Sequence, residues 1–473
     1  MLFAVYRREL SIPTNKSIGL SSNFATETSW DAFEQMRFET ASAERLTSSC
    51  NRQGFRISSA LPTCDAMTRP SLSLKPVLAG LLLTLAQIAV AIGLLAPEGP
   101  LFYRYTTLIQ HDSYWFENIV ERGYQTPVPP ISHKMMEVSN VAFFPAYPAI
   151  AALLRYGLHF STQNALLITA QAAAWGFWSY FFLFCDRWNL SPALQFFGAL
   201  SIIAHPAAFF LIAGYSESLF LMAVVGFIYW TSADTRAAKV WAALHGMVMS
   251  ATRIVGIPCA AFPVVRSIFT GGRRGLREPR SWLRHYGPAL SLMFAATLGA
   301  IVFFIYCQLR WGHWNIYMLT QSAGWGIVPD YLAVFKPSSY RWLAPALNNP
   351  KEASQLSMTL GALFLAVIAV CELLPPIRRR TEWATRAGFY FCAAVIYYIS
   401  VSGVAGVEME SMLRYEFCVH ALIVLAFLHF LHQFCFPPIL LRAFGMAVAL
   451  VSAAGLSVQG WYVWNFTRGN WVA

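Results

Sequence analysis

The chain has 473 residues, of which 57% are hydrophobic and only 12% are charged, and its formal net charge is +11. Because an ordinary soluble domain has about 25% charged residues, this composition excludes a soluble globular protein. The basic residues form short clusters between apolar runs, as cytoplasmic loops do, and this arrangement excludes a nucleic-acid-binding surface.

The N-terminal segment differs from the rest of the chain. Residues 1–66 are polar and rich in Ser and Thr, and they lack the apolar core of a signal peptide. Met67 is followed by basic residues and a membrane-length run, so it would make a natural start. We therefore expect residues 1–70 to be either a disordered cytoplasmic tail or an artefact of the start site, and residues 71–473 to form one integral membrane domain.

The apolar runs predict an all-α polytopic membrane protein with about eleven transmembrane helices. They are unbroken rather than alternating, which argues against a β-barrel. They fall near residues 77–96, 141–156, 163–184, 193–213, 216–232, 238–262, 286–308, 355–374, 387–405, 416–435 and 440–464.

Clusters of Lys and Arg predict the orientation of these helices. The loops 266–286 and 377–386 are the most basic, so both should face the cytoplasm. Counting spans from these loops places residues 97–140 and 309–354 on the outer face, in a periplasm or an ER lumen.

The long first outer loop contains the stretch HDSYWFENIVERGY (111–124), and AFFPAYP (142–148) follows it. Asp112 is a candidate general base. From the residues alone, the alternative is a helix N-cap. Glu117 lies about 140° around a helix from Asp112, so we do not expect the two carboxylates to pair.

Two charged residues lie within or between the middle apolar runs. Glu217 stands in GYSES (214–218), and its carboxylate at that depth is costly. The predicted layout places it on the inner side, away from Asp112, where it caps a helix, pairs with a buried Arg or has a functional role. Arg253 lies inside the sixth predicted span and needs either a partner, for which Glu217 is a candidate, or a phosphate.

Arg414 lies at the outer start of the tenth predicted span, in VEMESMLRYEF (407–417). It is a candidate ligand of a donor phosphate, and the alternative is an interfacial ion pair with Glu408 or Glu410. His205, which precedes Pro206, is expected to be a packed histidine at a helix end.

These stretches resemble a known family. HDSYWFENIVERGY and AFFPAYP are similar to the first outer loop of PIG-V-type mannosyltransferases, which comprise GPI mannosyltransferase II and its bacterial relatives within the glycosyltransferase C superfamily. HPAAFFLIAGYSESLF (205–220), ATRIVGI (251–257) and the ending from Trp471 resemble further parts of the family. His111 is a departure, because the family usually has Trp before the Asp.

The resemblance implies a glycosyltransferase C bundle with its active site on the non-cytoplasmic face. The reaction would transfer a sugar, mannose in the family, from a polyprenyl- or dolichyl-phosphate donor to a glycolipid or glycan acceptor, with inversion and with Asp112 as the base. Residues expected to bind substrate are His111, Glu117, Tyr124, Tyr147, Glu217, Arg253 and Arg414. The expected partners are the lipid-linked donor, the acceptor and membrane lipid, and no prediction is made for a partner subunit.

Other interpretations stay open at the level of sequence. Glu217 and Arg253 would suit the coupling charges of a secondary transporter, although the two halves show no repeat. A catalytically inactive membrane scaffold is the third alternative. No metal site is predicted, because the nine cysteines are scattered and there is no Asp-x-Asp, although a divalent metal on the substrate phosphate stays open. The short loops favour a bacterial inner membrane over the ER membrane.

Overall fold

The computed structural model describes residues 74–125, 139–233, 235–271, 279–343, 349–374, 383–407, 411–433 and 438–472. The chain divides into two units, Met1–Met67 and Thr68–Ala473, and everything below concerns the second. The prediction for residues 1–70 lies outside the described residues.

The described residues form helices and no strands. Seven helical stretches are long and apolar enough to cross a membrane. They are Leu74–Leu95 (α2, Leu74–Val90, with a π-helical turn, Ala91–Leu95), Thr162–Arg187 (α6), Tyr286–Trp311 (in α13, Pro279–Trp311), Lys351–Leu373 (in α15, Pro350–Leu373), Trp383–Val407 (α17, Trp383–Val404, with a short 3-10 turn), Met412–His432 (α18) and Arg442–Phe466 (in α19, Pro438–Phe466). The predicted all-α, multi-pass membrane fold is confirmed.

Shorter helices complete the bundle. Three of their apolar stretches are Pro192–Ile203 (α7), Glu217–Thr231 (α8) and Gly256–Phe269, which spans α10 (Gly256–Cys259) and most of α11 (Phe262–Gly271). The others include α3 (Leu101–Thr106), α4 (Asp112–Arg122), α5 (Ala146–Ala152), α9 (Arg236–Thr252) and α14 (Ile316–Trp325). The number of true spans stays a prediction.

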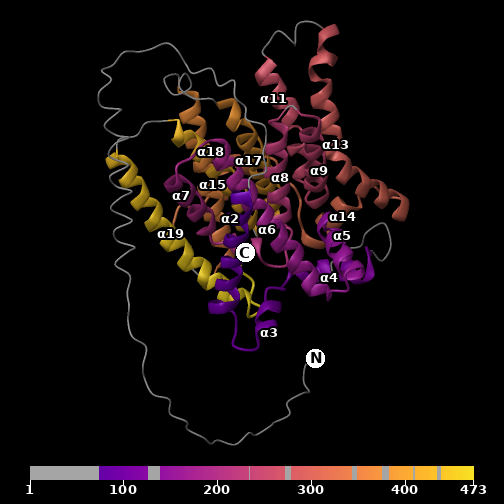
Figure 1. Ribbon diagram of the computed structural model, residues 1–473. Coiled ribbons are helices and arrows are strands. Elements are labelled where there is room, and N and C mark those ends of the chain that lie inside the picture. Colours follow the sequence, from indigo (N-terminus) through magenta and orange to yellow (C-terminus); the bar gives the residue numbers. More distant parts are fainter. Residues whose placement is uncertain are drawn as a thin grey trace, which may run out of the picture. The chain divides into compact units, whose positions relative to one another are not determined.

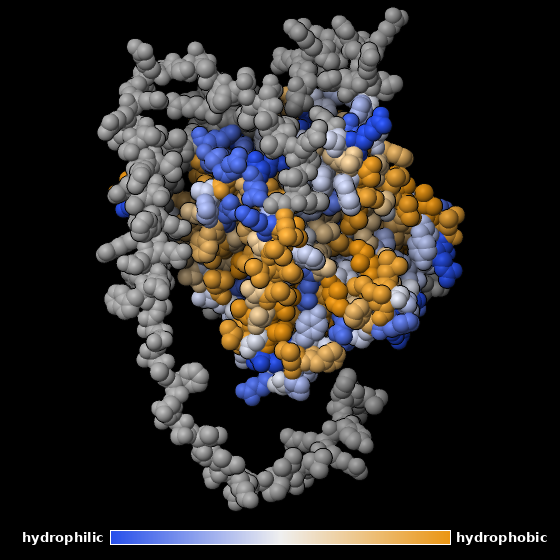
Figure 2. Space-filling model, viewed as in Figure 1, coloured by the Kyte–Doolittle hydropathy of each residue, from blue (hydrophilic) through white to orange (hydrophobic). Residues whose placement is uncertain are grey.

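Burial separates the central helices from the outer ones. In α18, 67% of the most apolar window is buried inside the protein, against 11% in α19 and 17% in the stretch that begins with α2. The outward side chains of these outer helices are large and apolar, such as Leu82 and Leu450, and apolar residues cover much of the face seen in Figure 2. Such a surface is suited to contact with lipid acyl chains.

Two apolar runs do not form the spans that the sequence predicts. The run 141–156 forms the seven-residue helix α5 and a five-residue π-helical turn, which together rise about 18 Å and fall short of a hydrocarbon core of about 30 Å. The run 238–262 breaks at Arg253, whose backbone is extended (φ −151°, ψ 146°), so α9 ends there and α10 begins at Gly256.

The link between α7 and α8 is the third departure from the predicted layout. After Ile203 the chain passes through a 3-10 turn, Ala208–Leu211, and stays buried until α8 begins at Glu217. The amide of Gly214 donates a hydrogen bond to the Leu108 carbonyl (3.1 Å), and a Cβ on Gly214 would lie 2.4 Å from Ile109 Cδ1. The link therefore packs directly against the chain just before α4.

This packing corrects the predicted position of Glu217. The structure places the carboxylate on the same side of the bundle as Asp112, and not on the opposite side. Because α5 is too short to cross, one crossing fewer separates the two residues. In Figure 1, α3, α4, α5 and the last turn of α19 lie toward one end of the bundle, and α11 lies toward the other.

Candidate active site

The site begins where α4 begins. His111 has φ 49° and ψ −110°, an unusual backbone conformation for a residue that is not glycine, and Asp112 is the first residue of the helix. Residues held in such strained conformations gather at functional sites. The N-cap position falls on His111, whose side chain makes no capping hydrogen bond. The structure therefore does not assign the N-cap role to Asp112.

Four charged side chains meet beside this helix start. The Arg414 guanidinium contacts Asp112 (Nη1–Oδ2 2.7 Å) and Glu217 (Nη1–Oε1 3.5 Å), and Arg253 contacts the same oxygen of Glu217 (Nη2–Oε1 2.5 Å). We call Asp112, Glu217, Arg253 and Arg414 the ionic cluster. Its two positive and two negative formal charges cancel, which offsets part of the cost of removing charged groups from water.

Exposure within the ionic cluster is uneven. The Glu217 side chain is fully buried and that of Arg414 is 6% exposed, whereas the Asp112 side chain is 24% exposed. A ligand arriving from solvent would therefore meet Asp112 first. Arg414 lies directly behind it and reaches Glu217.

Aromatic rings surround the Arg414 guanidinium. Its central carbon lies 5.2 Å from the Tyr215 ring centroid, 5.5 Å from Phe210 and 5.3 Å from Trp471. Cation–π contacts of this kind stabilise a desolvated cation. A hydrogen bond from Nη2 to Ser411 Oγ (2.9 Å) completes the orientation of the side chain. The rings come from the α7–α8 link and from the C-terminal end of the chain.

Several buried polar atoms around the ionic cluster have no hydrogen-bond partner among the described residues. Two are obligate donors, Arg414 Nε and Trp471 Nε1, and a third is His111 Nε2. The His111 and Trp471 rings meet edge to face, with their centroids 5.0 Å apart. Most buried polar groups in proteins are paired. A concentration of unpaired nitrogens beside a cation is therefore suited to hold an anionic oxygen.

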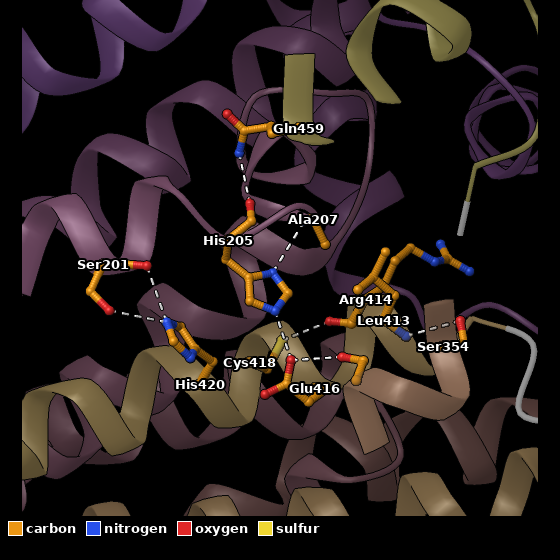
Figure 3. Close-up of polar contacts among 11 residues, drawn as sticks. Ser201, His205, Ala207, Ser354, Leu413, Arg414, Glu416, Cys418, His420 and Gln459 are labelled. Atoms are coloured by element: carbon orange, nitrogen blue, oxygen red, sulfur yellow. Dashed lines mark hydrogen bonds and ion pairs between the residues drawn. The ribbon is translucent and has the colours of Figure 1, made fainter. Parts of the chain in front are cut away.

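A second polar cluster anchors the helix that carries Arg414. His205 accepts a hydrogen bond from the Ala207 amide at Nδ1 (3.1 Å), so its Nε2 is the atom that donates to Glu416 (2.7 Å), and Ser357 donates to the same oxygen (2.8 Å). Figure 3 shows Arg414 and Glu416 pointing to different sides of α18. The His205–Glu416 bond thus ties α18 to the α7–α8 link behind the site. His205 is more than a packed helix-end residue.

Besides His111, three predicted substrate-binding residues lie outside the ionic cluster. Tyr147 is fully buried, and its hydroxyl donates to the Leu166 carbonyl (2.8 Å). Tyr124 donates to the Phe143 carbonyl (2.8 Å). Glu117 does not pair with Asp112, in line with its predicted place around the helix, and it is hydrogen-bonded to Gln163; burial raises the pKa of this carboxyl. The binding roles of these residues stay predictions.

The sequence singled out most of the ionic cluster and missed some of its surroundings. Of the two alternatives for Arg253, the structure shows the pairing with Glu217, and a role in phosphate binding stays a prediction. Arg414 pairs with Asp112 and Glu217, and its alternative partners Glu408 and Glu410 lie outside the described residues. Glu416 was not predicted, although a carboxylate within an apolar run is itself a signal. In the parts of the chain that the structure describes, no group of three His, Cys, Asp or Glu residues could hold a metal.

Comparisons with known proteins leave the family open. No protein-family model matches the chain, and no curated protein matches its sequence. Among solved structures, the oligosaccharyltransferase AglB from Archaeoglobus fulgidus, in complex with an inhibitory peptide and a dolichol-phosphate, is similar at TM-score 0.44 and 11% identity; 83% of this chain is covered and 56% of AglB. ArnT from Cupriavidus metallidurans bound to undecaprenyl phosphate is similar at TM-score 0.44 and 13% identity, with 83% and 75% covered.

The apo form of the Archaeoglobus fulgidus oligosaccharyltransferase gives TM-score 0.43 and 13% identity, with 83% of this chain and 56% of that chain covered. This chain therefore spans little more than half the length of the archaeal enzymes. Because all three scores are below 0.5, the likeness carries no argument about activity. The resemblance to PIG-V-type enzymes stays a prediction.

Proposed function

We propose that this protein is a membrane glycosyltransferase of the glycosyltransferase C type. It transfers a hexose, mannose by its resemblance to the PIG-V family, from a polyprenyl- or dolichyl-phosphate donor to a glycolipid or glycan. The single observation that carries the proposal is the contact of Arg414 with Asp112 beside unpaired nitrogens of His111 and Trp471. A cation, a carboxylate and spare donors are what transfer from a lipid phosphate requires.

The donor phosphate binds at Arg414 in this proposal. The guanidinium is held by aromatic rings and by Glu217, so little reorganisation is needed when an anion arrives. The Nε of Arg414 and the Nε1 of Trp471 supply hydrogen bonds that no protein atom takes. As the bond from the sugar C1 to the phosphate oxygen breaks, the negative charge left on that oxygen is stabilised by Arg414.

Asp112 takes the proton of the acceptor hydroxyl. The phosphate competes with Asp112 for the guanidinium, so donor binding frees a carboxylate oxygen at the most exposed corner of the ionic cluster. The acceptor oxygen then attacks C1 from the face opposite the phosphate and inverts that centre. Its proton passes to Asp112, and the lipid phosphate leaves with the electron pair of the broken bond.

The other members of the ionic cluster hold Arg414 in place. Glu217 bridges the two arginines, and Arg253 balances the charge of Glu217. The site would lie on the non-cytoplasmic face of a bacterial inner membrane. The positive-inside rule supports this sidedness, and the short loops support the choice of membrane.

The proposal is tested by sugar transfer in membranes that contain the expressed chain and radiolabelled polyprenyl-phosphate mannose. Asp112→Asn should lower transfer by at least about 100-fold, as expected for loss of a general base, while binding of the donor is retained. Asp330→Asn is the matched control, because Asp330 pairs with Lys336 in a solvent-accessible contact that includes no member of the ionic cluster. Expression and folding are checked for each variant.

Each outcome has a meaning. Transfer by the wild type and the control but not by Asp112→Asn supports both the class and the base. Equal transfer by all three removes Asp112 from the mechanism. Donor binding without any transfer would support a transporter or a scaffold in place of an enzyme.

A further inference from the structure

A cavity opens beside the ionic cluster at the same end of the bundle. Its volume is about 360 Å³, and α3, the start of α4 and the turn that follows α19 form its walls. This volume lies at the lower end of the range of small-molecule sites, which is about 300–1,000 Å³. The site described above does not use the cavity.

The lining of the cavity is polar and aromatic. The side chains that characterise it are Tyr103, Thr106, Gln110, Tyr114, Gln163 and Arg468. The two tyrosines line the cavity and are about half exposed. Gln110 donates to the Thr107 carbonyl (3.3 Å) and accepts from the Tyr114 hydroxyl (3.2 Å). Each amide group can give and accept a further hydrogen bond, which matches the hydroxyl groups of a sugar. A lipid chain would find few apolar contacts in such a cavity.

The charges around the cavity disfavour an anion. Arg468 is the cation among its lining residues, and its Nη1 already donates to the carbonyls of Leu95 (3.1 Å) and Trp464 (2.7 Å). The guanidinium also stacks on the Trp464 ring at 3.8 Å. Gln163 also lies close to Glu117, which brings a carboxyl group near the cavity. A neutral, hydroxyl-rich ligand fits this balance better than a phosphate.

The cavity and the ionic cluster share two segments of chain. Ile109 and Gln110 line the cavity, and Asp112 follows two residues later. On the C-terminal side, Gly469 lines the cavity, and Trp471 stacks near Arg414. A ligand in the cavity would therefore lie next to the segment that carries the candidate base. This position suits an acceptor, because the donor phosphate is assigned to Arg414.

We propose that this cavity binds a neutral hexose ring of the acceptor glycan, with Gln110 and Gln163 as its hydrogen-bonding residues and Tyr103 and Tyr114 as its ring platforms. That the bound hexose belongs to the acceptor rests on the proposed function. The prediction that a hexose binds here stands on the cavity itself.

The test measures sugar binding without donor and without turnover. The full chain is placed in lipid nanodiscs, since glucoside and maltoside detergents would compete, and saturation-transfer NMR is recorded with methyl α-D-mannopyranoside. Gln110→Leu and Gln163→Leu should each weaken binding about tenfold, the loss expected when one hydrogen-bonding partner is removed. Gln308→Leu is the matched control, because Gln308 is exposed and its side chain bonds to the Gly312 carbonyl and the Trp314 amide. Thermal unfolding confirms that every variant is folded.

The possible results separate clearly. Binding by wild type and control, with loss in the two variants, supports the inference. No binding to the wild type, equal binding to all variants, or displacement of the sugar by inorganic phosphate would overturn it. If sugar binding depends on both glutamines but the protein never transfers sugar from the donor, the proposed function is contradicted and the hexose site is supported. If the protein transfers sugar but binds none at the cavity, the hexose site is contradicted and the proposed function is supported.

Discussion

At the residue scale, the ionic cluster depends on one carboxylate. Glu217 is fully buried, and one of its oxygens contacts both Arg253 and Arg414. The other oxygen has no hydrogen-bond partner in the part of the chain that the structure describes. Without Glu217, two cations would face each other in a region largely shielded from water, and only Asp112 would offset them.

We therefore expect Glu217→Ala to lower the free energy of unfolding by about 3–5 kcal/mol, as measured by thermal or denaturant unfolding in lipid nanodiscs. Glu121→Ala should cost less than about 1 kcal/mol, because Glu121 pairs with Arg155 in an exposed contact. Removing Arg253 together with Glu217 should cost less than the sum of the single changes. Equal effects of Glu217→Ala and Glu121→Ala would show that the buried Glu217 contributes no more to the free energy of unfolding than an exposed ion pair does.

At the element scale, the break between α9 and α10 positions Arg253. The chain turns there because Gly256 packs against the last turn of α9, and a Cβ at that position would lie 2.4 Å from the Met249 carbonyl oxygen. A backbone contact this close leaves room only for glycine. The break is thus encoded by one small residue, and it frees the Arg253 side chain to reach Glu217 at a helix end.

Gly256→Ala should therefore destabilise the protein by about 1–3 kcal/mol and lower sugar transfer through displacement of Arg253. Gly403→Ala is the control, because a Cβ there would meet nothing within 4 Å. In a helix, that control change should be neutral or stabilising by up to about 1 kcal/mol. Unfolding and transfer are measured on the same preparations. Wild-type behaviour of Gly256→Ala would mean that the break does not need glycine.

At the scale of the whole described bundle, the site is assembled from distant parts of the chain. Asp112, Glu217 and Arg414 come from α4, α8 and α18, and Trp471 comes from the C-terminal end. The two ion pairs of Arg414 join residues that are about 200 and 300 positions apart. The site therefore requires that the α7–α8 link return to the side of α4, which the observed layout achieves because α5 does not cross.

This layout predicts which residues face each side of the membrane. In a cysteine-free background, Ala237→Cys, at the start of α9, should be shielded from a membrane-impermeant maleimide in intact cells, and Ser322→Cys, in α14, should be labelled. Both positions are exposed in the protein. The layout drawn from the sequence places residue 237 on the outer side, so labelling of Ala237→Cys would favour that layout over the one in the structure. Labelling after membrane permeabilisation is the control for reactivity.

The sequence by itself determined the class of protein and most members of the site. Long apolar runs and a low share of charge require membrane helices, because lipid cannot hydrogen-bond to the backbone. Glu217 and Arg253 stood out because charges within apolar runs are costly unless they are paired or used. Asp112 stood out through its place in the outer loop and the family resemblance, and Arg414 through its place at the outer start of a span.

Only the tertiary structure decided how these charges meet. Hydropathy does not show that the run 141–156 folds into a short helix, and it does not show that the run 238–262 breaks at Arg253, because both runs are apolar enough to span. A single misassigned crossing moves a residue to the opposite side of a membrane, and this displaced Glu217 from Asp112 in the predicted layout. The contacts of Trp471 with Arg414 and of His205 with Glu416 depend on helix packing, which local sequence does not encode.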